Sequence, residues 1–421
     1  MRMAKRKKVD NNKTVRRIKE EQLYDVAVAG GGASGMAAAL ILARENPAIK
    51  VALLEKKDDL GRKLRATGNG RCNLSNRAIP TVDETVAFFE SIGIPVRGDE
   101  TGRLYPYSES AATVVEVLKH RLMSAGVTCY TDAAVEKIDK TDGQFSLYTA
   151  SGICTARKVI LATGGKAGPS YGCSGDGYAL ARSFGHHITK TLPVLTGVCC
   201  DALPADLKGV RAKGELTLWR DEIQVFQEEG EVQFTDYGVS GICVFNLSRH
   251  LHYVGDARLS PYTIVLDLAP ERSFQSYFRA CALELGIKNM ACIEFLSGIV
   301  KKPLARWILD QAGIPEDLKL NECDETMLSK MENTFHQLVI RPQSVMGFKM
   351  AQCTAGGIAG EEVDDRTLES RIIPGLYFCG EILDYDGPCG GYNLDHAWRT
   401  GIQAARSAAQ ALLLEGGHHN G

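Results

Sequence analysis

Residues 24–35 read YDVAVAGGGASG, and this stretch decides the fold of the chain. An apolar strand pattern leads into Gly30, Gly32 and Gly35, and a helix pattern of small residues follows. Glycines at these spacings allow a tight turn, a close approach of backbone to phosphate, and close packing of helix on strand. The order strand, loop and helix predicts a Rossmann unit that binds a dinucleotide pyrophosphate. The next apolar run ends at Glu55, twenty residues after Gly35, where a carboxylate can hold the adenosine ribose.

A second glycine-rich segment lies near the other end of the chain. The apolar run of residues 376–379 ends at Gly380 and Glu381, and Gly390 and Gly391 then open a second helix pattern. A nicotinamide dinucleotide is usually held within one Rossmann half, whereas FAD is longer and needs contacts at its flavin end too. A late carboxylate can bind ribityl hydroxyls, and a helix N-terminus can face the flavin ring. The two segments together predict FAD as the cofactor.

The loop of residues 61–73, GRKLRATGNGRCN, holds too many glycines and cations for regular structure. A helix dipole contributes only about 0.3–1 kcal/mol, so two phosphate charges need further donors. The candidate donors in this loop are Lys63, Arg65, Thr67, Asn69 and Arg71. We expect the loop to complete the phosphate site; the alternative is an exposed basic loop.

The composition is that of a globular enzyme, since 44% of the 421 residues are hydrophobic and 24% are charged. The net charge of −2 gives no overall field toward nucleic acid or an anionic membrane, so neither is expected as a partner. Thirteen cysteines are scattered without a C-x-x-C pair, which argues against a disulfide reductase. With no recognisable signal peptide, they predict a reducing, cytoplasmic location. No metal site is predicted.

The chain is too long for one ordinary core, and its pattern changes between residues 190 and 339. We predict an α/β fold in which a Rossmann-type, glutathione-reductase-like FAD-binding domain is interrupted by an inserted β-barrel-like and helical domain. Strands are expected at 215–219, 223–226 and 232–235, and helices at 274–285, 293–312 and 325–338. The predicted segments are a basic disordered tail (1–22), a first FAD-binding segment (23–189), an antiparallel β domain (190–270), a helical domain (271–339), a second FAD-binding segment (340–415) and a tail (416–421).

Several longer motifs are more specific than the phosphate loop. They are residues 61–76 (GRKLRATGNGRCNLSN), 102–110 (GRLYPYSES), 162–177, 353–358 (CTAGGI) and 375–398 (GLYFCGEILDYDGPCGGYNLDHAW). With these motifs the chain, from residue 24 to about residue 414, resembles the BaiN/YhiN-type (HI0933-like) family of NAD(P)/FAD-dependent oxidoreductases. The resemblance implies bound FAD and a Rossmann-type domain interrupted by a β-barrel-like piece and a helical piece.

The predicted cofactor-binding residues follow from these motifs and from the residues that match the family pattern. They are Gly30, Gly32, Ala33, Ser34, Gly35, Glu55, Lys56, Lys63, Thr67, Asn69, Gly70, Arg71, Asn73, Val135, Thr163, Gly164, Gly380, Glu381, Asp384, Gly391, Tyr392 and Asn393. One departure stands out, because relatives commonly carry Phe-Thr-His where this chain has Phe234, Thr235 and Asp236. If that histidine serves substrate chemistry in relatives, the substrate or the proton route differs here.

The resemblance implies reduction of a conjugated C=C bond in a hydrophobic substrate such as a 3-oxo bile acid or steroid intermediate. We expect hydride transfer from flavin N5 to the β-carbon, with NADH or NADPH as the electron donor. Arg71 or backbone amides are predicted to polarise the ketone oxygen. A protein acid, with Tyr392 as the candidate, or water is predicted to protonate the α-carbon. Cys72 is a further candidate for a catalytic role at the flavin edge.

Two alternatives stay open. One is a flavin amine oxidase that acts on a small amino-ketone, because no second nucleotide-binding motif follows a strand. The other is an RNA- or partner-binding flavoprotein, supported by the nine Lys/Arg against three Asp/Glu up to Glu21. In either enzyme interpretation we expect substrate choice to depend on residues 190–339, above all on Asp236 and Tyr237.

Overall fold

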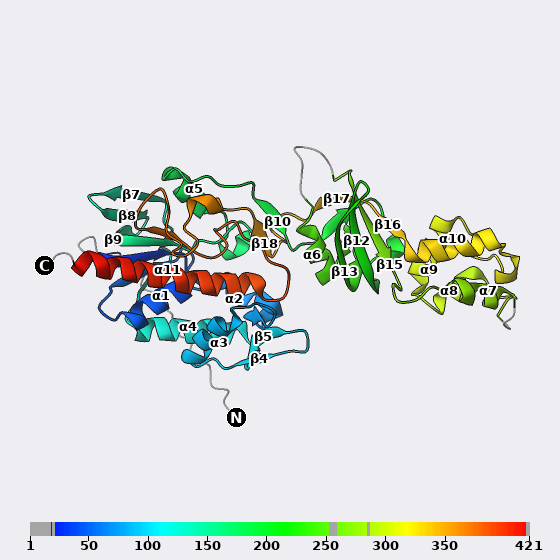
Figure 1. The fold of residues 1–421 in the computed structure, drawn as a ribbon, viewed down its shortest axis with the longest axis horizontal. Coiled ribbons are helices and arrows are strands. Elements are labelled where there is room, and N and C mark those ends of the chain that lie inside the picture. The colour runs from blue at the N-terminus through cyan, green and yellow to red at the C-terminus, as the bar shows by residue number, and fades with distance from the viewer. Residues whose placement is uncertain (1–17, 19–21, 252–258, 284–286, 418–421) are drawn as a thin grey trace, which may run out of the picture.

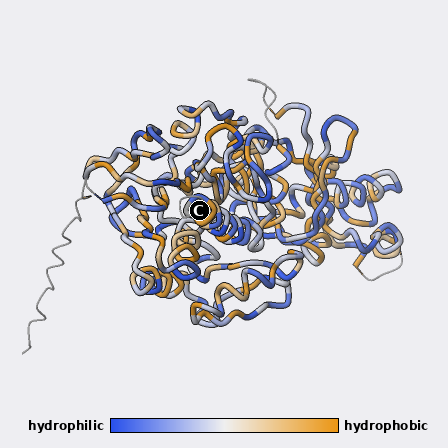
Figure 2. The backbone as a smooth tube through the Cα atoms, turned by 60° about the vertical axis from the view of Figure 1, so that its left-hand side comes forward, coloured by the Kyte–Doolittle hydropathy of each residue, from blue (hydrophilic) through white to orange (hydrophobic). Residues whose placement is uncertain are grey.

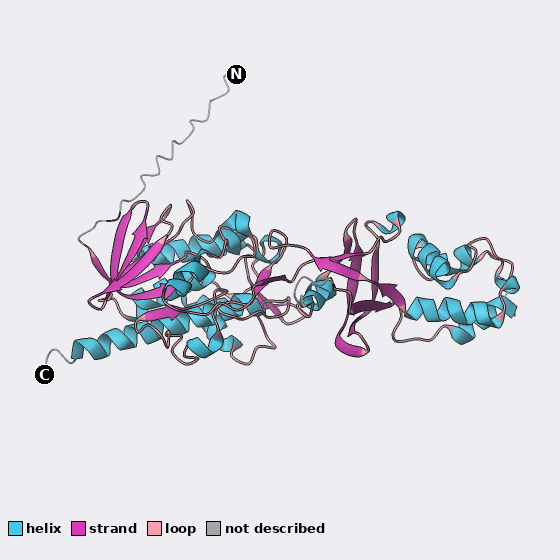
Figure 3. Cartoon of the chain, turned by 90° about the horizontal axis from the view of Figure 1, so that it is seen from above, coloured by secondary structure: helices cyan, strands magenta, loops and turns pink. Residues whose placement is uncertain are grey.

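The chain folds into three regions in a row: a large α/β region, a β region, and a helical region farthest from the first (Figure 1). This computed structural model describes residues 18, 22–251, 259–283 and 287–417, so most of the predicted basic tail lies outside it. The same order is seen from above, where the long last helix, α11 (Tyr392–Gly417), runs along the α/β region (Figure 3). The predicted fold class, a Rossmann-type α/β fold with an insertion, is confirmed.

The α/β region is built on a seven-stranded sheet in the order β6-β2-β1-β9-β8-β7, with β19 paired to β9 as well. The strands are β1 (Leu23–Ala29), β2 (Val51–Leu54), β6 (Thr128–Tyr130), β7 (Lys137–Thr141), β8 (Gln144–Thr149), β9 (Gly152–Leu161) and β19 (Leu376–Phe378). β6, β2, β1, β9 and β19 are parallel, whereas β7 and β8 pair antiparallel. The central parallel strands are buried, which explains their continuous apolar sequences.

Helix α1 (Ala33–Glu45) is buried almost all round, because its small residues allow close neighbours. It packs against α11 and α4 (Ala111–Ser124). A Cβ at Gly401 of α11 would lie 2.4 Å from the backbone oxygen of Ser34, so the two helices touch there. The remaining elements of this region are α2 (Arg62–Arg65), α3 (Val82–Ser91), α5 (Asp176–Ser183), and the small sheet of β3 (Ser75–Asn76), β4 (Val96–Gly98) and β5 (Arg103–Pro106).

The chain passes twice between the α/β region and the β region. The two passing segments, β10 (Leu192–Val194) and β18 (Cys353–Ala355), pair antiparallel. The second seven-stranded sheet then has the order β16-β15-β12-β13-β14-β11-β17. Its strands are β11 (Val198–Cys200), β12 (Arg211–Arg220), β13 (Ile223–Phe234), β14 (Gly238–Ser240), β15 (Tyr262–Asp267), β16 (Leu338–Ile340) and β17 (Pro342–Val345). Since the two edge strands are consecutive in the chain, the sheet must curl like a barrel.

Two sequence expectations in the insertion need correction. The strands expected at 223–226 and 232–235 form one continuous strand, β13, which pairs with β12 along its length. The helix expected at 293–312 is two helices, because Pro303 lies in the first turn of the second one and cannot donate a backbone hydrogen bond. The helices of this region are α7 (Gln275–Leu283), α8 (Cys292–Ser297), α9 (Lys302–Ala312) and α10 (Glu325–His336).

Hydrophobic and hydrophilic stretches alternate along the backbone (Figure 2). Buried apolar residues form one large cluster in the α/β region and a second one shared by the β and helical regions. Within the described residues, no helix has the length and apolar character to span a membrane. We propose the predicted domain division with its boundary at residues 339 and 340 moved past β17, because β16 and β17 both belong to the second sheet.

Candidate functional site

A cavity of about 800 Å³ opens where the parallel strands of the first sheet end. Small-molecule sites have volumes of about 300–1,000 Å³, and in open α/β sheets they lie at the carboxyl ends of the strands. The wall includes residues that follow β1, β2 and β9, then residues 62–73, and finally residues that open α11. Helix α6 (Ile242–Ser248) of the β region contributes Ile242 and Phe245 to the wall.

The glycine loop between β1 and α1 forms one end of this cavity. Gly30 has a φ of +113°, and a Cβ there would lie 2.3 Å from the carbonyl oxygen of Ala162. A Cβ at Gly35 would lie 1.8 Å from the carbonyl oxygen of Gly30, whereas one at Gly32 would meet no protein atom within 4 Å. No side chain caps α1, so its first N–H groups are available to an anion.

Glu55 lies beside this loop, as expected for a ribose-binding carboxylate. It accepts hydrogen bonds from the backbone N–H groups of Gly31 and Lys57, both at 2.8 Å. Burial raises the pKa of Glu55, and these two bonds and the neighbouring lysines partly oppose that rise. A carboxylate offers about four acceptor positions, so Glu55 can still accept a ligand hydroxyl.

Two of the predicted loop cations lie on the cavity wall. Lys63 forms an ion pair with Glu381, which also lines the cavity, with 2.5 Å between Nζ and Oε2. Burial opposes the charge of Lys63, but Glu381 outweighs it and raises the lysine pKa. The guanidinium carbon of Arg71 lies 4.8 Å from the ring centroid of Tyr105, a cation–π contact.

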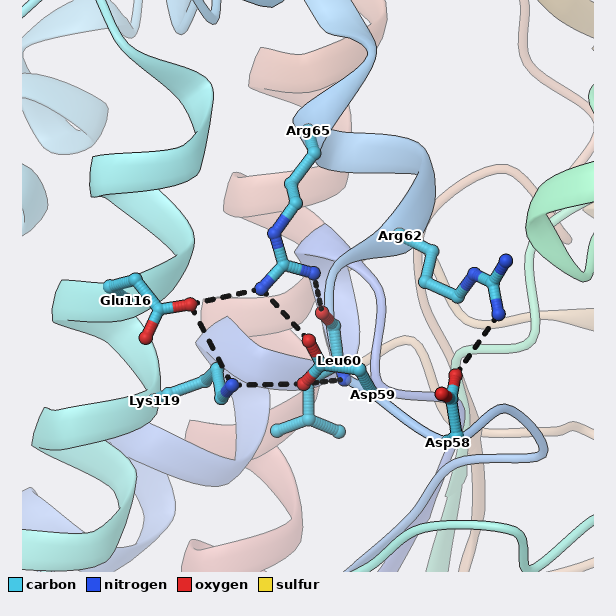
Figure 4. Close-up of polar contacts among 7 residues, drawn as sticks. All are labelled: Asp58, Asp59, Leu60, Arg62, Arg65, Glu116 and Lys119. Atoms are coloured by element: carbon cyan, nitrogen blue, oxygen red, sulfur yellow. Dashed lines mark hydrogen bonds and ion pairs between the residues drawn. The ribbon is translucent and has the colours of Figure 1, made fainter. Parts of the chain in front are cut away.

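Arg65 does not line the cavity, which corrects the expectation that it contacts phosphate. Its polar contacts lie elsewhere (Figure 4). Its guanidinium donates to the backbone oxygen of Leu60 at 2.9 Å and pairs with Asp59 and Glu116, each at 3.0 Å. Lys119 also forms ion pairs with Asp59 and Glu116. These acidic partners lie before α2 and on α4, so Arg65 fastens the loop to α4.

The late glycine-rich segment packs against the first glycine loop. A Cβ at Gly380 would lie 2.4 Å from the Ser34 hydroxyl, so the two glycine-rich segments touch. Asn393 uses its amide within its own loop, donating to the oxygen of Gly387 and accepting from its N–H, both at 2.8 Å. Glu381 also accepts a hydrogen bond from the N–H of Thr354.

Most predicted cofactor residues share this one cavity. Those on its wall are Gly30, Gly32, Ala33, Ser34, Glu55, Lys56, Lys63, Thr67, Asn69, Arg71, Asn73, Val135, Thr163, Gly164, Glu381, Gly391 and Asn393. Those off the wall are Gly35, Gly70, Gly380, Asp384 and Tyr392. Gly35 and Gly380 are required by packing, whereas Asp384 is exposed and accepts a bond from the Thr189 hydroxyl at 2.7 Å.

The structure does not support four of the residues expected in catalysis or substrate choice. Tyr392 does not line the cavity. Cys72 is fully buried away from the wall, and burial raises its pKa to about 12, so its thiol keeps its proton. Asp236 is exposed and pairs with Lys208 at 3.0 Å. Tyr237 is also absent from the wall.

Sequence reasoning missed several residues of the wall. These are Arg103, Tyr105, Cys173, Leu195, Ile242, Phe245, residues 349–353, Tyr385, Cys389 and His396. Arg103 and Tyr105 lie in the motif of residues 102–110, where their spacing of two could have indicated one strand face. Among the described residues of 190–339, only Leu195 and two residues of α6 reach the cavity, and α7–α10 lie at the far end of the molecule (Figure 1).

Three buried polar atoms of the wall have no hydrogen-bond partner among the described residues. They are Asn73 Oδ1, Thr163 Oγ1 and His396 Nε2. An unpaired buried polar group costs about 1–3 kcal/mol, so such atoms indicate where a polar ligand belongs. Burial also lowers the pKa of His396 to about 4, so this ring is neutral at neutral pH. It stacks on Tyr385 with 3.9 Å between centroids.

Comparison with known proteins agrees with this geometry. The HI0933-like protein Rossmann domain matches residues 80–407, and an NAD(P)-binding Rossmann-like domain matches residues 28–90. The chain is 36% identical to the 3-dehydro-bile acid delta(4,6)-reductase of Clostridium scindens, over 91% of this chain and 99% of that one. It is 26% identical to the ribosomal RNA dihydrouridine synthase of Escherichia coli, over 93% of this chain and 98% of that one.

A solved structure shares the fold. The 3-ketosteroid delta1-dehydrogenase of Sterolibacterium denitrificans has 12% identity and a TM-score of 0.51, covering 92% of this chain and 100% of that one. At this identity the likeness concerns the fold alone. The family match over most of the chain confirms the resemblance seen in the motifs: this protein belongs to the HI0933-like family.

Proposed function

We propose that this protein is an FAD-dependent oxidoreductase. The observation that carries the proposal is one cavity that joins two glycine-opened helix N-termini, at Gly32 of α1 and at Gly391 of α11. A dinucleotide that spans both ends needs an anion site at one and a polar, flat site at the other. The wall offers both, since the open space before Gly32 suits phosphate and the unpaired Asn73 Oδ1 suits a ring N–H.

The residues that would hold FAD follow from their positions. The loop from Gly30 to Ser34 would bind the pyrophosphate, Glu55 the ribose, and the backbone near Val135 the adenine. Asn73 and Glu381 would contact the flavin half. The buried Thr163 hydroxyl, which has no hydrogen-bond partner among the described residues, would gain one from FAD.

We further propose that the reaction saturates a C=C bond conjugated with a carbonyl group. Reduced FAD supplies a hydride equivalent when bound. One relative is named for reduction of a 3-dehydro-bile acid, and two are named as dihydrouridine synthases. Dihydrouridine differs from uridine by saturation of a ring C=C next to a carbonyl, so both names describe the same type of bond.

The chain's own residues suit this chemistry. Arg71 can donate to the substrate carbonyl and stabilise the developing enolate oxygen. We now assign proton donation to Tyr385 in place of Tyr392, because Tyr385 lines the cavity and burial raises its pKa, so it stays protonated at neutral pH. NADH or NADPH is proposed as the electron donor. Leu195 and Phe245 offer an apolar wall for a hydrophobic substrate.

A second candidate is reduction of a uridine base in RNA. It is favoured by the match over 93% of this chain to a protein named ribosomal RNA dihydrouridine synthase. We favour the small hydrophobic substrate, because identity to the bile acid reductase is higher and the wall beside α6 is apolar.

Turnover under anaerobic conditions tests the proposal. The purified protein, loaded with FAD, is incubated with NADH or NADPH and either a 3-oxo-4-ene bile acid or a uridine-containing ribosomal RNA fragment. We expect the bile acid to gain two hydrogens by mass spectrometry and the RNA to stay unchanged. A mass gain in the RNA alone would establish the second candidate. Failure to retain FAD would refute the proposal, and reduction of the flavin by an amine alone would indicate an oxidase.

A further inference from the structure

We propose that the cavity contains an anion subsite centred on Arg103, and that the substrate is therefore a small amphipathic molecule with a carboxylate. This inference rests on the proposed function and names the substrate class of the same site. The charges of the cavity wall are its basis.

Cations near the glycine loop already have acidic partners. Lys56 pairs with Asp176, Arg62 with Asp58 and Lys63 with Glu381. Arg71, Arg103 and Lys349 line the same cavity. Within the residues that the structure describes, none of these three has a carboxylate within the 4.0 Å of an ion pair. These three residues thus leave positive charge on the cavity wall that no ion pair among the described residues neutralises.

Arg103 is fixed at the start of α11. It lies opposite Asn76 in the pairing of β5 with β3, and the Asn76 amide donates to the oxygen of Gly390 at 2.9 Å. A Cβ at Gly390 would lie 3.6 Å from Arg103 Nε, so the half-buried arginine reaches the loop that opens α11. Its backbone N–H donates to Asp99, whose carboxylate is exposed and also holds Thr101.

A second guanidinium, that of Arg71, lies against a side chain of the same strand. Tyr105 lies two residues beyond Arg103, so both side chains point to the same side of β5. The Tyr105 ring holds Arg71 in its cation–π contact. An arginine fork suits bidentate binding of a carboxylate, and a half-buried guanidinium without a partner is costly. Phe245 and Met350 line the same cavity and offer apolar surface for the rest of an amphipathic molecule.

The test compares a 3-oxo-4-ene bile acid with its methyl ester, which carries one methyl group more and lacks the negative charge. Dissociation constants are measured on the oxidised holoenzyme by calorimetry, so turnover is not required. Wild-type protein should bind the acid more tightly than the ester. In Arg103→Gln, this preference should fall by about tenfold or more, the value of a charge-assisted hydrogen bond.

The matched control is Arg97→Gln on the neighbouring strand β4. Arg97 pairs with Glu109 and does not line the cavity, so the preference for the acid should stay as in wild type. Equal binding of acid and ester by wild-type protein would overturn the inference. So would an Arg103→Gln variant that weakens both ligands equally, or tight binding of a uridine-containing RNA that depends on Arg103.

The two proposals fail in different ways. If the acid binds through Arg103 but no substrate is reduced, the proposed reaction is wrong and the anion subsite stands. If the bile acid is reduced but Arg103→Gln keeps the preference for the acid, the anion subsite is wrong and the reaction stands. A shift of the flavin reduction potential in Arg103→Gln, with an unchanged acid preference, would assign the arginine to the cofactor instead.

Discussion

Two glycine-to-alanine substitutions, three residues apart, should affect different properties of the protein. Gly35→Ala places Cβ 1.8 Å from the backbone oxygen of Gly30, so helix and strand must separate, at a cost of about 1–3 kcal/mol or more. Gly32→Ala places Cβ in open space, and Gly32 has a φ of −81°, which alanine adopts without strain. Loss of unfolded-state entropy stabilises this variant by about 0.4–1 kcal/mol, while the poorer N-cap costs about the same, so its stability should not change.

Gly32→Ala should instead weaken cofactor binding. The Cβ of Gly32→Ala enters the space where we place the pyrophosphate, and we expect FAD affinity to fall at least about 100-fold, near 2.7 kcal/mol. Urea unfolding of both apo-variants gives the stability, and FAD titration followed by flavin fluorescence gives the affinity. A Gly32→Ala protein that binds FAD as wild type does, or unfolds as early as Gly35→Ala, would refute the reasoning.

Further substitutions test the neighbouring assignments. Arg65→Ala should lose about 1–3 kcal/mol of stability but keep FAD affinity, because its partners are Leu60, Asp59 and Glu116; urea unfolding and FAD titration check this, and a loss of FAD affinity would return Arg65 to the phosphate site. His396 has a folded pKa of about 4 against 6.5 when unfolded, so the unfolded state binds the proton first as the pH falls. Wild-type stability should therefore drop by about 3 kcal/mol between pH 6.5 and 4 because of this residue, and unfolding curves of His396→Gln should lack that share of the drop. Tyr385→Phe should slow turnover at least about tenfold with FAD retained, whereas Tyr392→Phe should not; equal rates would remove Tyr385 from proton transfer. Arg249→Ala breaks the contact of α6 with Asp386, 2.6 Å from Nε to Oδ2, and should raise the substrate KM without releasing FAD.

The Rossmann elements could be predicted because their signals are local. The spacing of Gly30, Gly32 and Gly35 and the apolar run before them lie within one short segment. The prediction of one helix at 293–312 is wrong, and the reason is also local: Pro303 lies in the first turn of a separate helix, α9. The sequence of the long strand β13 predicts two strands because its middle is polar, but pairing with β12 keeps it extended.

The site was harder to predict because it depends on partners far apart in the chain. The basic loop around Arg65 predicts contact with phosphate, yet Glu116, 51 residues later, holds this arginine. Arg103 stands in a motif that the sequence makes recognisable, but only the fold places it beside Gly390. Asp236 departs from the family pattern, and the structure places it on the surface.

A single turnover tests the central claim most directly. The FAD-loaded protein is reduced chemically under anaerobic conditions and mixed with one equivalent of a 3-oxo-4-ene bile acid, while the flavin absorbance is followed. We predict that the flavin reoxidises and that one saturated 3-ketone forms for each flavin. A flavin that stays reduced with this substrate and reoxidises only when oxygen is admitted would contradict the proposed reaction.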